Sequence, residues 1–354
     1  MSREQTISLT SLQFLVATLL LEGLIGFTGV GSDVAYAQRK AGQSGATFLE
    51  IGVGARQAAL GSAATAVGRD ANQVFWNPAG TALAGDQTAS AMISYNDWLA
   101  GLQYSSLAFG YNLGFGGTLT VGVQAFGLSD IQANRENDEN LPEAFDPLIT
   151  DNRSSDTFNY LDLALSASYS HNFLNERLSI GVTSKYIRET IDRVSASAVA
   201  FDFGTVYRLG FAGWKIAARI NNLGTPLKFY NQENRLPLSF SIGTSIYPIN
   251  NESTRLMLAV DTIKPLDSQQ LAYGGAELSF FDLLFLRGGY KFNYYNSTDE
   301  GTSARPPIET TVEQFTLGGG LQYVISDVPV AFDYAFTSMR LLDDSHRLSL
   351  SLSL

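Results

Sequence analysis

The sequence predicts an all-β protein, a 14-stranded antiparallel transmembrane β-barrel with an N-terminal hatch or plug segment. From residue 87 onward, apolar residues alternate with small polar residues, and the connections between these segments are short and long in turn. Charged residues make up only 16%, whereas Gly (33), Tyr (16) and Phe (22) are frequent. We therefore expect a signal peptide (1–37), a hatch segment (38–86) and a barrel (87–354).

The N-terminus has the pattern of an export signal. The apolar stretch "LQFLVATLLLEGLIGFTGV" follows Arg3, and the "VAYAQ" after it places Ala35 and Ala37 where a small-residue cleavage site has them. The alternative is a retained membrane anchor, but Glu22 inside the apolar stretch favours removal. We expect cleavage after Ala37.

The next segment, residues 38–86, lacks the period of two and is rich in Ala and Gly. Within it, "ARQAALGSAATAV" predicts a short helix with small side chains, and Asn77-Pro78 predicts a turn, because the residue before proline avoids the helical region. Small side chains permit close packing inside a narrow tube. The segment is therefore predicted to be a plug.

The barrel strands follow from alternation. In "TLTVGVQAF", Leu119, Val121 and Val123 share one face, and Thr118 and Thr120 lie on the other. Strands of about 9 to 11 residues with this pattern are typical of transmembrane barrels. The predicted segments are 88–95, 103–112, 117–127, 158–171, 177–188, 197–208, 213–221, 237–247, 254–262, 270–280, 283–292, 312–324, 328–337 and 346–354.

The connections argue against a soluble β-sandwich, which would also alternate. Every even-numbered connection is brief, whereas 128–157, 189–196, 222–236 and 293–311 are long. Outer-membrane barrels have short periplasmic turns and long external loops. An even strand number also places both ends of the barrel in the periplasm.

The chain ends in "RLSLSLSL". As a strand, this stretch turns all its leucines toward lipid and all its serines toward the lumen. We expect it to close the barrel against the first strand and to act as the C-terminal insertion signal. The signal residues are Leu348, Leu350, Leu352 and Leu354.

Strand parity also assigns charged residues to the lumen. Five acidic and five basic side chains fall on the polar face, so we expect them to neutralise one another or to hold a plug, because a buried charge needs a partner. The alternative is a wet channel with solvated charges and no specific pairing. The predicted lumen charges are Asp162, Lys185, Asp202, Lys215, Arg219, Asp261, Glu277, Arg287, Lys291 and Asp333.

Composition excludes several functions. The chain has no cysteine and a net charge of −11, so Cys-ligated zinc and a thiol nucleophile are excluded and nucleic-acid binding is not expected. The two histidines, His171 and His346, fall at opposite ends of the predicted barrel, so we expect neither catalysis nor histidine-ligated metal, and no cofactor. The acidic loop 129–157 is predicted to be solvated, with binding of a cation or a basic partner as the alternative.

Two aromatic clusters, "LKFYN" and "YKFNYYN", end predicted strands on the external side. Most of these rings are expected in the interfacial girdle. The alternative is that some of them bind a partner protein, because aromatic anchors dominate many interfaces. The candidates are Phe229, Tyr230, Tyr294 and Tyr295.

The stretch "FLEIGVGARQAALGSAATAVGRDANQVFWNPAG" resembles the N-terminal signature of the PorV/PorQ family, which is more distantly similar to FadL-type fatty-acid transporters. The resemblance continues through "GVTSKYIRETIDRVSASAVAFDFGTVYRLGF", "INNLGTPLKF", "LPLSFSIG" and "HRLSLSLSL", and so spans nearly the whole mature chain. The hatch motif that it implies comprises Gly52, Gly54, Arg56, Asp70, Asn77, Pro78, Ala79 and Gly80.

The resemblance implies a barrel of the bacterial outer membrane that contacts lipid and binds proteins in type IX secretion or cell-surface attachment. The implied partners are secretion or attachment proteins, or the C-terminal domains of secreted cargo. The FadL-like alternative is an outer-membrane transporter of hydrophobic small molecules, which requires a hydrophobic ligand.

Overall fold

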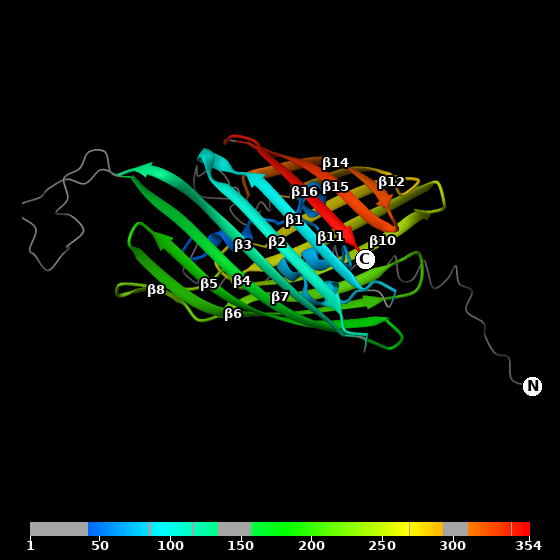
Figure 1. Ribbon diagram of the computed structural model, residues 1–354, viewed down its shortest axis with the longest axis horizontal. Helices are drawn as coiled ribbons and strands as arrows, with labels where there is room; N and C mark the ends of the chain where they lie inside the picture. Colours follow the sequence, from blue (N-terminus) through cyan, green and yellow to red (C-terminus); the bar gives the residue numbers. More distant parts are fainter. Residues whose placement is uncertain are drawn as a thin grey trace, which may run out of the picture. The chain divides into compact units, whose positions relative to one another are not determined.

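The computed structural model describes residues 42–83, 86–114, 117–133, 157–268, 270–292, 311–340 and 342–354 (Figure 1). The predicted signal peptide, most of the acidic loop, and Tyr294 and Tyr295 lie outside the described residues. None of the helices in the described ranges combines the length and apolar content needed to cross a bilayer.

Fourteen antiparallel strands form one closed barrel, which confirms the predicted fold (Figure 1). Each strand pairs with its sequence neighbours, and the last strand pairs with the first. The barrel strands are β1 (Ala89–Asp97), β2 (Gln103–Asn112), β3 (Gly117–Gln132), β4 (Thr157–Phe173), β5 (Leu178–Ile191), β6 (Val194–Arg208), β7 (Lys215–Gly224), β10 (Ser239–Asn250), β11 (Thr254–Pro265), β12 (Leu271–Phe280), β13 (Leu284–Phe292), β14 (Glu313–Ile325), β15 (Val328–Met339) and β16 (Ser345–Ser353).

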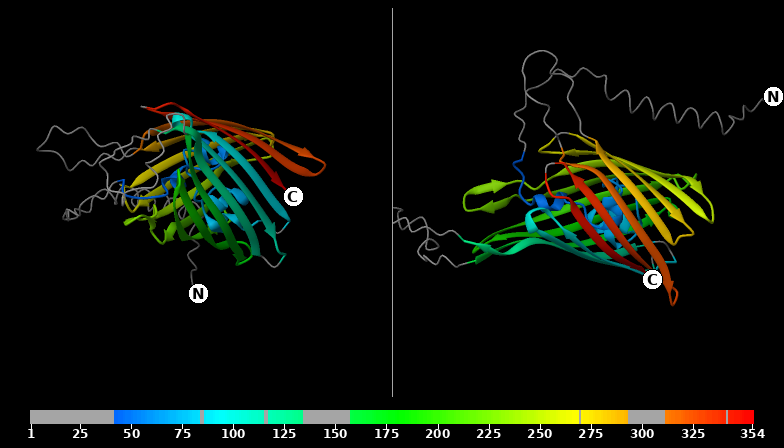
Figure 2. Two further views of the ribbon diagram at one scale, coloured as in Figure 1. Left: turned by 60° about the vertical axis from the view of Figure 1, so that its left-hand side comes forward. Right: turned by 90° about the horizontal axis from the view of Figure 1, so that it is seen from above.

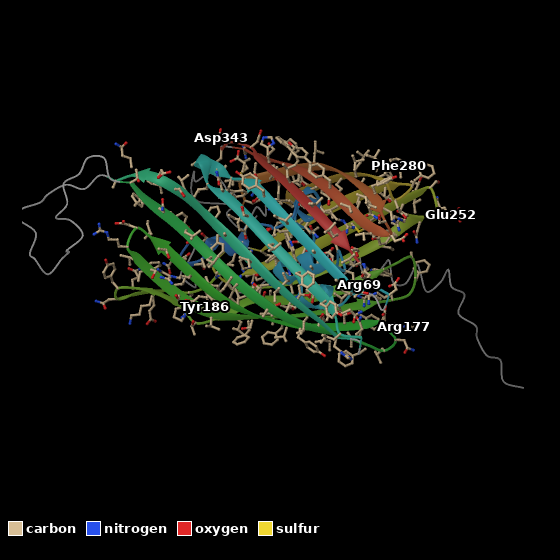
Figure 3. The ribbon with its side chains drawn as sticks, viewed as in Figure 1. Arg69, Arg177, Tyr186, Glu252, Phe280 and Asp343 are labelled. Carbon is tan, nitrogen blue, oxygen red and sulfur yellow. The ribbon has the colours of Figure 1, made fainter. Side chains whose placement is uncertain are left out.

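Burial alternates along the strands as the sequence predicts. In β2, Leu107 and Phe109 are exposed on the outer face, whereas Tyr104, Ser106 and Ala108 are buried on the inner face. Figure 3 shows side chains projecting from the outer surface of the wall, among them Tyr186. The outer face is therefore the lipid-facing surface, and the polar face lines the lumen.

One end of the barrel carries only tight connections, such as 251–253 and 326–327, and we call it the short-turn end. The opposite end, the long-loop end, carries a hairpin of β8 (Leu227–Phe229) and β9 (Gln232–Asn234) inside the predicted loop 222–236. Figure 3 labels Glu252 at the first end and Asp343 at the second.

The predicted long loop 189–196 is wrong. β5 continues to Ile191 and β6 begins at Val194, so only Asp192 and Arg193 remain as a turn. The outward positions here are polar, for example Arg188. A strand that extends past the hydrocarbon region needs no apolar outer face, so the ladder continues where the apolar alternation stops.

Four short helices precede the barrel wall, and we call residues 42–83 the hatch. They are η1 (Thr47–Glu50), α2 (Ala55–Ala59), η2 (Ala71–Phe75) and η3 (Pro78–Thr81). Figure 2 shows this blue segment enclosed by the strands. Nearly all hatch residues from 53 to 83 are buried or half-buried.

The helix predicted for "ARQAALGSAATAV" is wrong beyond its first turn. Helix α2 ends at Ala59, because Gly61 and Ser62 both have positive φ angles, 65° and 67°. Gly61 then lies against the backbone of β13, where a helical turn would not fit. Tertiary packing thus overrides the helix propensity of the alanines.

The C-terminal strand closes the barrel, with Ile93 of β1 opposite Leu350 of β16. The Leu354 N–H donates to the Ala89 carbonyl at 2.8 Å, and the Leu354 carbonyl accepts from the Ala89 N–H at 3.0 Å. Of the four predicted signal leucines, Leu348, Leu350 and Leu354 are exposed on the outer face and Leu352 is half-buried.

We expect Leu350→Lys to destabilise this seam by about 2–4 kcal/mol, the cost of a lysine facing lipid near the bilayer midplane. Ser351→Ala, on the opposite face of the same strand, should be nearly silent. Urea unfolding of the refolded barrel in lipid vesicles measures both. Equal tolerance at the two positions would mean that the assigned faces are wrong.

Candidate functional site

The inner wall carries glycines where the hatch approaches most closely. A Cβ atom at Gly318 would lie 2.5 Å from the Ala59 Cβ atom, and one at Gly122 would lie 2.7 Å from Phe75. Cβ atoms at the other positions would overlap hatch backbone or the Asn77 side chain. These positions are Gly181, Gly204, Gly275 and Gly289.

Wall side chains also satisfy the hatch backbone, which has little regular structure of its own. The Thr316 hydroxyl accepts from the Gly61 N–H at 3.0 Å and donates to the Ala59 carbonyl at 2.9 Å. The Asp261 carboxylate accepts from the Thr65 N–H at 2.8 Å. Further hatch contacts come from Ser90, Thr118, Ser170, Glu189, Ser245 and Ser349.

The Asn-Pro-Ala element of the predicted hatch motif fixes the fold of the hatch. The Asn77 side chain is fully buried, and its Nδ2 donates to the Thr65 carbonyl at 2.8 Å. Its Oδ1 accepts from the Ala79 N–H at 3.1 Å, which caps η3, and Pro78 begins that helix.

The glycines of the motif have a similar local role. Gly54 has a φ of 85° and, like Gly52 and Gly80, lies against another hatch side chain, so a Cβ atom would clash there. Asp70 precedes η2 and borders a polar cavity. Burial raises the pKa of the Asp70 carboxyl, and Arg56 opposes this rise.

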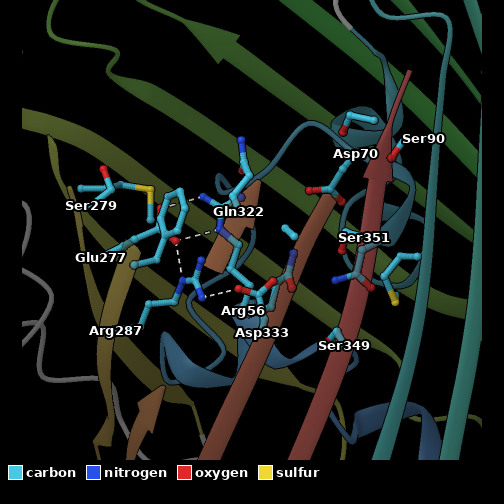
Figure 4. Close-up of a pocket in the computed structure, with 18 of the residues that line it drawn as sticks. Arg56, Asp70, Ser90, Glu277, Ser279, Arg287, Gln322, Asp333, Ser349 and Ser351 are labelled. Atoms are coloured by element: carbon cyan, nitrogen blue, oxygen red, sulfur yellow. Dashed lines mark hydrogen bonds and ion pairs between the residues drawn. The ribbon is translucent and has the colours of Figure 1, made fainter. Parts of the chain in front are cut away.

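A buried ion network joins the hatch to two parts of the wall (Figure 4). Arg56 of the hatch forms a bidentate pair with Glu277 of β12, with both N···O distances at 2.8 Å. The Arg287 guanidinium of β13 donates to Glu277 at 2.6 Å and to Asp333 of β15 at 2.6 Å. The side chains of Glu277 and Arg287 are 6% and 3% exposed, so the four groups depend on one another.

A second ion pair supports a bulge in the wall. Lys185 lies 2.6 Å from Asp202 and donates to Asn222 at 2.9 Å. Asn222 has a φ of 63°, and its N–H donates to Asp202 at 2.8 Å. Nearby, Arg219 donates to the Trp76 carbonyl of the hatch at 2.9 Å.

The remaining predicted lumen charges lie outside these two networks. Asp162 accepts a hydrogen bond from the Tyr160 hydroxyl, and Lys291 pairs with Glu313. Lys215 is half-buried at the short-turn end. The sequence prediction omits further inward charges. Inward parity also holds for Glu189, Arg208, Arg255 and Arg347, whereas Glu313 faces inward only because of the bulge between Glu313 and Thr316.

The long-loop half of the lumen is filled with apolar side chains from the chain itself. Phe48 is 1% exposed and stacks on Phe126 at 6.5 Å between ring centroids. Tyr104 packs edge-on against Phe126 at 5.7 Å, and Leu49 and Ile51 join the same cluster. Phe48, Leu49 and Ile51 of the "FLEI" stretch thus pack within the barrel.

A cavity beside the ion network is lined mainly by polar groups. Its volume is about 230 Å³, and it is lined by the ion network, by Asp70 and by the serines of β16 (Figure 4). Burying an apolar molecule there would desolvate charged groups without replacing their hydrogen bonds.

Of the predicted partner-binding aromatics, only two lie in described residues. Phe229 of the β8–β9 hairpin is half-buried and packs against the apolar cluster around Phe48. Tyr230 at the tip of the hairpin is 74% exposed. Phe229 is therefore a packing residue, whereas the Tyr230 ring is accessible to a partner.

Solved structures with a similar fold include a hydrocarbon channel and a toluene transporter. The CymD monoaromatic hydrocarbon channel is 14% identical with a TM-score of 0.54, and the match covers 86% of this chain and 97% of that one. The toluene transporter TbuX of Ralstonia pickettii is 12% identical with a TM-score of 0.55, covering 85% and 98%. At these identities the likeness shows the fold alone. No curated protein matches the sequence.

The family described as type IX secretion system protein PorV matches residues 34–269, about two thirds of the sequence. With the closed barrel, this match places the protein in the bacterial outer membrane. Because such barrels have short periplasmic turns, we assign the short-turn end to the periplasm. The chain belongs to the PorV family.

Proposed function

We propose that this protein acts by binding other proteins in type IX secretion or surface attachment, and that its lumen is not a transport route. The observation that carries the proposal is the filled lumen. The hatch occupies the inner wall at the glycine positions and is bonded to the wall by Arg56, Thr316 and Asp261. The surfaces left for binding a partner are then the outer face of the barrel and its loops.

The alternative, a route for hydrophobic small molecules, needs an apolar pocket under the hatch and an exit. The apolar half of the lumen is filled by Phe48 and its neighbours, and the cavity beneath α2 is lined by charged groups. Both features favour the protein-binding role. The similarity to hydrocarbon channels supports the shared fold only. Transport of hydrophobic molecules is one of the outcomes that the experiment below can detect.

The long-loop end is the expected contact surface, because it faces the cell exterior. Tyr230 projects from the β8–β9 hairpin, and Leu227 of the same hairpin is fully buried, so the hairpin is anchored to the barrel. An exposed aromatic residue on an anchored hairpin loses little conformational entropy on binding, which suits a protein contact.

Affinity purification from the native outer membrane tests the proposal. We expect secretion components, or proteins that share a C-terminal sorting domain, to co-purify with the wild type and less so with Tyr230→Ala. The matched control is Phe281→Ala, which removes an equally exposed aromatic ring at the short-turn end. Recovery of lipid-like ligands without such proteins would overturn the proposal in favour of transport.

A further inference from the structure

Three basic side chains converge at the short-turn end of the lumen. Arg208 of β6 and Lys215 of β7 are direct cross-strand partners, and both lie on the inward-facing register. Arg69 of the hatch supplies the third charge, and it shares Glu176 with Arg208, because Arg69 donates to the Glu176 carboxylate and Arg208 to its backbone carbonyl. Figure 3 labels Arg69 toward the end of the barrel that carries Arg177. Like charges directly opposite each other on a sheet are destabilising, so this arrangement needs a compensating group.

Two of the three side chains are held in place. Arg208 Nη1 donates to the Glu176 carbonyl at 2.7 Å and to the Ser179 hydroxyl at 2.8 Å. Arg69 donates to the carbonyls of Ala82 and Leu83, at 2.6 and 3.1 Å. The Arg208 guanidinium is therefore positioned by neutral oxygens, whereas Arg69 is held by two backbone carbonyls and by the Glu176 carboxylate at 3.0 Å.

The acidic groups nearby do not balance the three charges. Glu176 pairs with Arg69 at 3.0 Å, and its side chain is 44% exposed. Asp70 acts on Lys215 electrostatically but also on Arg56. Among the residues that the structure describes, Nζ of Lys215 has neither a hydrogen-bond acceptor nor an ion-pair partner.

We propose that Arg208, Lys215 and Arg69 form an anion-binding site for a phosphate group that enters from the periplasm. A guanidinium beside an ammonium matches phosphate, because the planar fork donates to two oxygens and the lysine adds a compact charge. The side chains of Arg208 and Lys215 face the lumen at its periplasmic end and are only half-buried. The occupant of the site is the phosphate of a soluble molecule or of a lipid headgroup at the rim.

The site is testable without any secretion partner. Purified protein in a non-ionic detergent and low-phosphate buffer is titrated with inorganic phosphate, and binding is followed by calorimetry and by the melting temperature. We expect phosphate to raise the melting temperature of the wild type. Lys215→Gln should weaken binding at least 10-fold and should itself melt higher than the wild type without phosphate, because the repulsion from Arg208 is gone.

Two further variants distinguish phosphate binding at this site from nonspecific effects of removing a positive charge. Arg208→Gln should also lose binding, which keeps the test valid if one variant folds poorly. Lys264→Gln is the control, because Lys264 is an exposed lysine at the long-loop end of β11 and should leave phosphate binding unchanged. Binding by Lys215→Gln and Arg208→Gln equal to that of the wild type would overturn the proposal.

The source of the phosphate is resolved by a parallel titration with micelles of short-chain phosphatidic acid. Binding of inorganic phosphate supports a soluble source, and binding of the micelles alone supports a lipid headgroup. If Lys215→Gln loses the binding of phosphate or of the micelles that the wild type shows, the proposed site is supported. Failure of the wild type to bind both probes contradicts it.

Discussion

Replacing Gly289 by valine is expected to prevent the hatch from docking and to destabilise the barrel by about 3 kcal/mol or more, the upper range for overpacking. A Cβ atom at Gly289 would overlap the backbone of Leu60 and Gly61, and the Gly61 N–H is already bonded to Thr316. Backbone held in this way cannot yield as a flexible side chain would. Urea unfolding in lipid vesicles and protease digestion of the hatch measure the effect.

The chain contains its own control at the adjacent position. Gly288 faces outward, and a Cβ atom there would come no closer than 3.8 Å to another residue. Gly288→Val should therefore be well tolerated. Gly318→Val and Gly319→Val form a second pair of the same kind, with nearest distances of 2.5 and 3.7 Å. Equal losses within each pair would contradict a tightly docked hatch.

Glu277→Gln is expected to cost about 3–5 kcal/mol, the range for removing one partner of a buried ion pair. Glu277 is the carboxylate that Arg56 and Arg287 share, so its loss leaves Arg56 without its acceptor and Arg287 with Asp333 alone. Glutamine preserves the volume, which isolates the effect of charge. The same urea unfolding assay measures the change in the free energy of unfolding.

Two comparisons sharpen this result. Glu233→Gln breaks the Lys228–Glu233 pair, whose side chains are 58% and 60% exposed, and should cost at most about 1 kcal/mol. The double variant Arg56→Met/Glu277→Met should lose less than the sum of its single variants, because the two charges are then removed together. Additive losses would show that the network does not couple the hatch to the wall.

The barrel was predictable because the bilayer imposes a strict alternation on each strand. Parity alone assigned Glu277, Arg287 and Asp333 to the lumen, since a one-residue shift would have placed them in lipid. Strand ends beyond the hydrocarbon region lack an apolar outer face, so the alternation predicts a long loop where the structure has the turn Asp192–Arg193.

The contacts between the hatch and the wall could not be predicted from strand alternation. Nothing local indicates that Gly289 meets Gly61 or that Glu277 pairs with Arg56, because these contacts join residues more than 200 positions apart. The early end of α2 has the same origin, since Gly61 and Ser62 adopt positive φ against the wall. The "FLEI" stretch begins the segment that carries the family resemblance, but only the structure shows that Phe48 packs in the lumen.

Single-channel recording in planar bilayers tests the central claim most directly, namely that the hatch seals the barrel. We predict no steady conductance for the wild type, because the hatch is bonded to the wall from Ala55 to Leu83. Gly289→Val should open the lumen if it still inserts, whereas Gly288→Val should remain closed. Large, steady open-channel currents from the wild type would contradict the account.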